Sequence, residues 1–166
     1  MAADWRIRAA RVEDLSQLAP VEAAADSLFT QHFGAVDWPG PESGQTRAAA
    51  RGFLLVAVIG GDVVGFVHVL TPGEAAHLEQ LSVRPEVGRQ GIGSALVRAA
   101  MREAAARGFR ELTLRTFADV AWNAPFYVRF GFVITEPRTP FELALVATEN
   151  RLGLTQLGAR VQMTAS

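Results

Sequence analysis

A glycine-rich segment between a predicted strand and a predicted helix contains residue types that suit anion binding. Its residues are Gly88, Arg89, Gln90, Gly91, Ile92, Gly93 and Ser94. The first backbone N–H groups of a helix have no partner within the helix and attract anions, and glycines let that backbone approach a ligand closely. The segment therefore predicts a site for a diphosphate, and the alternative is a tight turn that binds nothing.

The spacing of this segment excludes two familiar phosphate-binding motifs. A dinucleotide-binding fingerprint that starts at Gly91 requires glycine or alanine at position 96, where the chain has Leu96. A P-loop that starts at Gly88 requires lysine at position 94, where the chain has Ser94. A diphosphate would have to be bound in another way.

Tyr127, Glu79 and His77 are the candidate groups for proton transfer. Tyr127 is the only tyrosine in the chain, and a phenol can donate a proton to a leaving group. His77 and Glu79 are two positions apart in a predicted strand, so both side chains point to one face of the sheet, where either can accept a proton from an ammonium group. Each residue also has a purely structural interpretation. Tyr127 could be a core aromatic residue that packs beside Phe126 and Phe130, and His77 and Glu79 could be polar residues of the sheet whose hydrogen bonds are made by their neighbours.

The composition removes several classes of function. The chain has no cysteine, and all 16 of its Lys+Arg residues are arginine. Thiol nucleophiles, thiolate metal sites and Schiff-base lysine chemistry are therefore excluded. A formal net charge of −1 gives no broad attraction to nucleic acid or to an anionic membrane. We expect no metal, nucleic-acid or membrane partner.

Hydrophobic periodicity predicts the elements that position these groups. Strands are predicted at residues 5–9, 53–59, 63–70, 77–83, 112–115, 132–134 and 160–163. Helices are predicted from residue 13 to the following loop, at 46–51, 92–107 and 123–130, and from 141 onwards. A loop rich in glycine and proline is expected from about Thr30 to Gly44, and 60–62 reads as a hairpin turn.

The length and the order of these elements indicate one α+β domain with a mixed sheet over residues 1–166. The first 15 residues lack the apolar region of a signal peptide, and the longest apolar run, residues 53–59, is too short to span a membrane. Together with the absence of cysteine, this favours a cytoplasmic location.

Three segments taken together resemble the GCN5-related N-acetyltransferase (GNAT) family. They are residues 78–85 (LEQLSVRP), the glycine-rich segment, and residues 123–132 (NAPFYVRFGF). The resemblance covers residues 53–134 and implies a mixed, mostly antiparallel central sheet of about seven strands with helices on both faces. It also implies acetyl-CoA as the co-substrate. The chain departs from the family at Gly88, where the pattern usually starts with Gln or Arg.

The resemblance also implies roles for individual residues. Tyr127 matches the family's general acid, and we rank Glu79 slightly above His77 as the base. The residues implied in cofactor binding are Leu81, Ser82 and Val83 through their main chain, the glycine-rich segment from Gly88 to Ser94, and Asn123 and Phe126. The family's strands splay apart beside Ser82 and leave backbone donors free. Asn123 has an alternative as the cap of its helix, which is the safer interpretation from its position alone.

The acceptor is the least readable part of the sequence. Phe29, His32 and Trp38, with Phe33 and Val36, are candidate walls of an acceptor pocket, although the favoured interpretation of the aromatic residues is that they close the core. No neighbouring motif supports a catalytic role for His68 or His32, and we expect both at the surface, from where His32 could reach the acceptor pocket.

The favoured function is transfer of an acetyl group from acetyl-CoA to the primary amine of a small molecule, by direct attack in a ternary complex. Three alternatives stay open: a protein or peptide N-acetyltransferase, a non-catalytic acyl-CoA-binding sensor, and an acyltransferase that prefers a longer acyl chain. A homodimer and a monomer are both compatible with the sequence.

Overall fold

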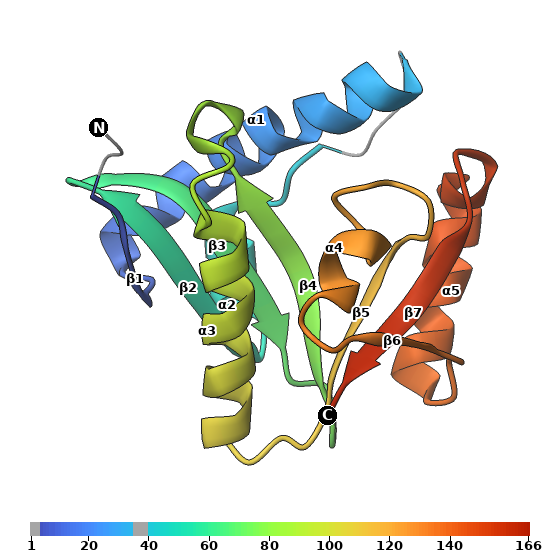
Figure 1. Cartoon of the computed structure of the whole chain (residues 1–166). Helices are drawn as coiled ribbons and strands as arrows, with labels where there is room; N and C mark the ends of the chain where they lie inside the picture. Colours follow the sequence, from blue (N-terminus) through green and yellow to red (C-terminus); the bar gives the residue numbers. More distant parts are fainter. Residues whose placement is uncertain (1–3, 35–39) are drawn as a thin grey trace.

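The computed structural model describes residues 4–34 and 40–166, which form one seven-stranded sheet with helices around it (Figure 1). The strand order is β1-β2-β3-β4-β5-β7-β6. The strands are β1 Arg6–Ala9, β2 Gly52–Ile59, β3 Asp62–Leu70, β4 Ala76–Val83, β5 Leu112–Phe117, β6 Val133–Thr135 and β7 Arg160–Ala165. Only β4 and β5 pair in parallel within this sheet. The expected mixed, mostly antiparallel sheet is confirmed.

Helices cover both faces of the sheet because the central strands are apolar on both sides. Val56 of β2 packs in one core with Leu18 of α1 (Leu15–Phe33). Its neighbour Leu55 points the opposite way and packs in a second core with Leu96 of α3 (Ile92–Ala106). The shorter helices are α2 Gly44–Ala49, α4 Ala124–Val128 and α5 Pro140–Arg151. None of the helices in the described part of the chain has the length and hydropathy to cross a membrane.

Helix α1 continues to Phe33, beyond Thr30, where the sequence predicted the start of a loop. No glycine or proline interrupts the chain between Pro20 and Gly34. Gly34 then adopts a φ of +81°, which an L side chain rarely adopts, and the helix ends there. Three of the candidate acceptor residues, Phe29, His32 and Phe33, therefore lie on the last turns of a helix. The other two, Val36 and Trp38, fall outside the described residues.

Helix α2 begins at Gly44, two residues earlier than predicted, and packs closely on α1. The Ser43 hydroxyl accepts a hydrogen bond from the Thr46 amide (3.1 Å) and caps the helix. A Cβ atom at Gly44 would lie 2.0 Å from the carbonyl oxygen of Leu15. The absence of a side chain at Gly44 therefore lets the two helices pack together.

The parallel pairing of β4 with β5 ends almost as soon as it begins. It covers only Ala76 with Leu112 and His77 with Thr113. Beyond these pairs the two strands diverge, as Figure 1 shows, so that one edge of β4 from residue 78 to residue 83 is not paired with β5. The predicted opening beside Ser82 is present.

A β-bulge marks the start of this opening. Strand β3 pairs His68 with Gln80 and Val69 with Leu78, so Glu79 is an extra residue on β4. A bulge re-aims side chains and increases the local twist. The bulge therefore changes the direction of the Glu79 side chain at the point where β4 and β5 separate.

We predict that Gly44→Ala destabilises the protein, because its Cβ would collide with backbone that cannot yield without moving α1. A loss of about 2 kcal/mol or more is expected for such overpacking, which lowers Tm by roughly 4 °C or more in a chain of this size. Thermal unfolding followed by circular dichroism measures the change. Gly61→Ala is the matched control, since a Cβ there meets no atom within 4 Å. Equal Tm values for the two variants would contradict the packing argument.

Candidate active site

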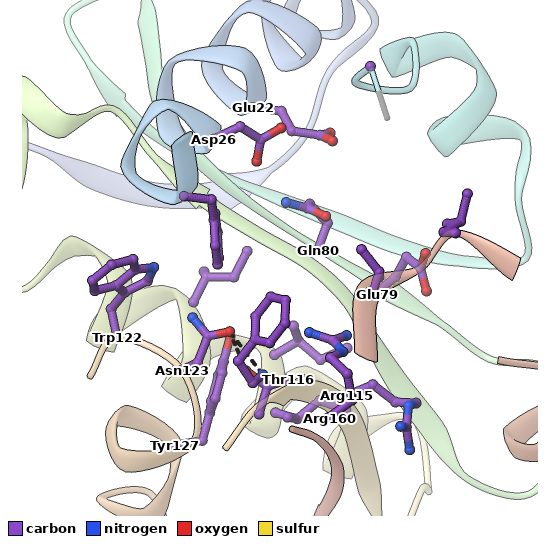
Figure 2. A pocket seen from close by; sticks show the side chains of 18 residues that line it. Glu22, Asp26, Glu79, Gln80, Arg115, Thr116, Trp122, Asn123, Tyr127 and Arg160 are labelled. Carbon is purple, nitrogen blue, oxygen red and sulfur yellow. Dashed lines mark hydrogen bonds between the residues drawn. The ribbon is translucent and has the colours of Figure 1, made fainter. Parts of the chain in front are cut away.

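A cavity of about 370 Å³ lies where β4 and β5 separate (Figure 2). Its walls come from β4, β5, α1, α4, β7 and the segment that follows α5. Figure 2 shows Glu22 and Asp26 of α1 on one side of the cavity and Arg115 of β5 and Arg160 of β7 across from them. In the described residues, no group of three or more His, Asp or Glu side chains is placed to hold a metal ion.

Glu79 lines this cavity from the bulge in β4. About a third of its side-chain surface is exposed (33%), while protein atoms surround the rest of it. Burial raises the pKa of its carboxyl to about 7; the Arg47 guanidinium opposes this rise, and the carboxylates of Glu42, Glu22 and Glu149 add to it. A carboxyl group with this pKa is partly ionised at neutral pH and can exchange a proton there.

His77 lies on the same side of β4 as Glu79, as predicted, but does not line this cavity. Its Nε2 is 3.7 Å from Oε2 of Glu79, its Nδ1 is 2.9 Å from the Thr113 hydroxyl, and its ring packs edge-on against Phe141. Burial and the nearby Arg115 lower the pKa of His77 to about 4. The imidazole is therefore neutral at physiological pH and is held in place behind Glu79.

Tyr127 of α4 lines the same cavity from the opposite side of the opening. Its ring packs against Phe126 and Phe132, with centroids 5.1 and 5.7 Å away. The hydroxyl makes no hydrogen bond to any described residue. Burial raises the pKa of Tyr127 well above its usual range, so the hydroxyl keeps its proton at neutral pH.

Asn123 does not cap its helix through its side chain, contrary to the interpretation made from its position. Its Oδ1 instead accepts hydrogen bonds from the Thr116 hydroxyl (2.6 Å) and the Phe117 amide (3.2 Å). These bonds attach the start of α4 to β5, because Asn123 can reach a strand that has no partner on this edge. Asn123 itself also lines the cavity.

The glycine-rich segment forms a second hollow, of about 380 Å³, at the start of α3. Gly91 precedes the helix with a φ of +83°, and Arg89 has a φ of +64°. The hollow is lined by Val83, Val87, Gly88, Arg89, Gly91, Ile92, Gly93, Ser94, Phe126 and Arg129. Gln90 is the only residue of the predicted segment outside this lining, and its Oε1 is buried without a partner among the described residues.

The three β4 residues that were predicted to bind the cofactor lie between the cavity and the hollow at α3. Leu81 lines the cavity, Val83 lines the hollow at α3, and the buried Ser82 hydroxyl accepts a hydrogen bond from the Gln80 side chain (3.0 Å). Phe126 and Tyr127, which are adjacent in α4, likewise contribute one to each hollow. The two sites are thus adjacent along both walls of the opening.

The aromatic residues of α1 close one end of the cavity. Phe29 lines it and packs against Phe117 (6.0 Å between centroids) and Trp122 (5.7 Å). His32 does not line the cavity, but its ring packs against Trp122 at 5.4 Å. Phe33 packs against Phe117 at 5.1 Å. Of these three candidates, only Phe29 borders the space available to an acceptor.

Sequence reasoning missed two buried charged clusters beside the cavity. In one, Arg47 of α2 bonds Glu22 (2.8 Å) and Nδ1 of His68 (3.0 Å). The prediction that His68 lies at the surface is wrong: it is 2% exposed, because α1 packs on its strand and Arg47 of α2 bonds its ring. In the other, Glu149 joins Arg115 to Arg160. The only indication of these clusters in the sequence is the alternation along β5, which puts Arg115 on the same face as Thr113.

The model of the family described as "Acetyltransferase (GNAT) family" matches residues 15–132. Three solved structures share the fold. The ribosomal-protein-S18-alanine N-acetyltransferase from Escherichia coli is 22% identical with a TM-score of 0.68, and the match covers 97% of this chain and 92% of that chain. The PaiA N-acetyltransferase from Thermoplasma acidophilum, in complex with coenzyme A, is 16% identical with a TM-score of 0.70 and coverages of 98% and 99%. A GNAT family acetyltransferase from Brucella melitensis, in complex with acetyl-CoA, is 24% identical with a TM-score of 0.61 and coverages of 83% and 92%.

The family match spans the opening between β4 and β5, the glycine-rich segment and the helix that carries Tyr127. It extends over well more than half of the chain, and it confirms the resemblance drawn from the three sequence segments. The chain belongs to the acetyltransferase (GNAT) family.

Proposed function

We propose that this acetyltransferase transfers an acetyl group from acetyl-CoA to the primary amine of a small molecule, with Glu79 as the base and Tyr127 as the acid. The observation that carries the proposal is the cavity between β4 and β5. There, a carboxyl with a pKa of about 7 and a protonated phenol that has no hydrogen-bond partner among the described residues border the same space from opposite walls.

The residues present fit acetyl-CoA. The first amides of α3 lie in the hollow beside Gly91, where a backbone without side chains at Gly88, Gly91 and Gly93 can approach a diphosphate. The free edge of β4 from Leu81 to Val83 leads from that hollow to the cavity and offers main-chain groups to an extended amide-containing arm. The Arg129 side chain adds a positive charge at the hollow.

The bound donor supplies an activated acyl group, and the protein's residues handle the protons. The Glu79 carboxylate accepts a proton from the bound ammonium, directly or through a water molecule, and leaves a neutral amine. The amine nitrogen then attacks the acyl carbon; the carbon–nitrogen bond forms, the carbon–sulfur bond of the donor breaks, and the second proton of the nitrogen is released to water. The Tyr127 hydroxyl donates a proton to the departing sulfur, which a phenol held in its protonated form is suited to do. His77, neutral and bonded to Thr113, holds one side of Glu79. No cysteine is present, so we propose direct attack in a ternary complex.

A panel of small amines and N-terminal peptides, assayed with acetyl-CoA by release of free thiol, tests the proposed acceptor class. Thiol release with small primary amines supports it. Release with peptides alone would replace it by protein N-acetylation, and binding of acetyl-CoA without release to any amine would indicate a sensor. Replacing acetyl-CoA by propionyl- and succinyl-CoA in the same assay measures the acyl preference.

Tyr127→Phe should lower kcat by roughly 10²- to 10⁴-fold, the usual contribution of a general acid. Affinity for acetyl-CoA should stay the same, because the ring still packs against Phe126 and Phe132. Steady-state kinetics and titration calorimetry separate the two effects. Turnover at the wild-type rate would remove Tyr127 from the role of acid.

The pH profile of kcat/KM for the amine should rise as the pH increases through about 7, because only the ionised form of Glu79 accepts a proton. Glu79→Gln should lose this limb and most of the activity. His77→Gln should keep a limb in this region, since the pKa of His77 is about 4 and its charge does not change there. Loss of the limb in His77→Gln alone would assign the base to His77 instead.

A further inference from the structure

Two arginines share one carboxylate in the wall of the proposed acceptor cavity. Arg115 donates to Glu149 through Nε (2.8 Å) and Nη2 (3.0 Å), and Arg160 donates to the same carboxylate through Nε (3.1 Å) and Nη2 (3.0 Å). All three side chains are largely buried: Arg115 is 8% exposed, Glu149 is 10% exposed and Arg160 is 12% exposed. The four hydrogen bonds use the full acceptor capacity of the carboxylate.

This cluster carries a net positive charge. Burial acts to raise the pKa of Glu149, but the hydrogen bonds from Arg160 and Arg115 outweigh it and hold that pKa below its usual range. Glu149 is therefore ionised, arginine is always protonated, and two positive charges face one negative charge. A buried unmatched charge is costly, so such a site favours a ligand that supplies the missing anion.

The unmatched charge faces the cavity. Both Arg115 and Arg160 line the cavity, whereas Glu149 does not, and Figure 2 shows both arginine side chains at one wall. Each guanidinium uses Nε and Nη2 on Glu149, and its Nη1 donates to no described residue. Arg160 is also held in place by the Phe117 ring, which lies 4.5 Å from its Cζ. Two fixed donor groups are thus available at this wall.

We infer that the acceptor amine also carries a carboxylate, which binds to Arg115 and Arg160; this inference rests on the proposed function. A carboxylate brings one negative charge and two oxygens in a plane, which match the net charge of the cluster and the geometry of guanidinium donors. A phosphate dianion would exceed that charge beside Glu149. Glu79 borders the same cavity, so an acceptor whose carboxylate binds the two arginines would keep its amine in the space that the proposed base faces.

The side chain of such an amino acid would meet an apolar surface. Phe29, Phe117, Trp122, Leu152 and Leu154 all border the cavity. We therefore extend the inference to amino acids with apolar or aromatic side chains, in which a hydrophobic group fills the rest of the cavity.

The test compares each amino acid of a panel with its decarboxylated amine, in the wild-type protein and in Arg160→Gln. The variant keeps Arg115 paired one to one with Glu149. We expect the wild type to favour the amino acid, and Arg160→Gln to reduce the ratio of the two kcat/KM values by about tenfold or more, mostly through KM of the amino acid. The ratio measured for the wild type is then divided by the ratio measured for Arg160→Gln. Because both proteins receive the same compounds, this division cancels differences in amine reactivity.

Arg107→Gln is the matched control, because it removes an exposed arginine from an ion pair with Glu103 on α3 and should leave the ratio unchanged. Titration with acetyl-CoA and Tm show whether Arg160→Gln is folded. Should it not fold, the wild type alone decides: carboxylic acids that lack the amine should compete with the acceptor, and their carboxamides should not. A wild type that prefers the decarboxylated amines, or that the acids fail to inhibit, overturns the inference. No thiol release with any amine would instead overturn the proposed function.

Discussion

The separation of β4 from β5 is the constraint on which the site depends. Two strands that continued their ladder past His77 and Thr113 would fill the sheet with backbone hydrogen bonds and leave no space between them. Because the ladder stops, the edge of β4 is free for a ligand and the side chains beside it border a cavity. The bulge at Glu79 lies at the same point, so the carboxylate is placed where the opening begins.

An opening inside a sheet has to be held apart, and buried polar contacts do this on each side. Asn123 accepts hydrogen bonds from β5 and so attaches α4 along one rim. Glu149 of α5 binds Arg115 of β5 and Arg160 of β7. On the other side of the cavity, the Arg47 side chain of α2 bonds Glu22 of α1, and the absence of a side chain at Gly44 lets these two helices pack together. Loss of one partner in such a pair leaves a buried charge unmatched, so the walls resist movement.

Most of the fold could be predicted because β2 and β3 are continuous apolar runs, which is typical of strands buried on both faces, and because apolar and polar residues alternate along β1 and β5. Alternation put His77 and Glu79 on one face, and glycine spacing located the start of α3. Contacts between elements distant in the sequence could not be predicted in the same way. Asn123 looked like a helix cap because capping is a local property, whereas its actual partners are defined by the path of β5. His68 is buried because α1 packs on its strand and Arg47 of α2 bonds its ring.

In the proposed mechanism, the partial burial of Glu79 is what allows a carboxyl group to deprotonate an ammonium. In water, a glutamate near pKa 4.3 and a primary ammonium near 10.4 differ by about six pKa units, which makes the transfer strongly unfavourable. With Glu79 at about 7, that difference narrows to roughly three units. Entry of the ammonium into the same partly desolvated cavity lowers its own pKa and narrows the difference further. In the proposed mechanism, the opening in the sheet thus supplies both the space for the acceptor and the environment that makes its amine a nucleophile.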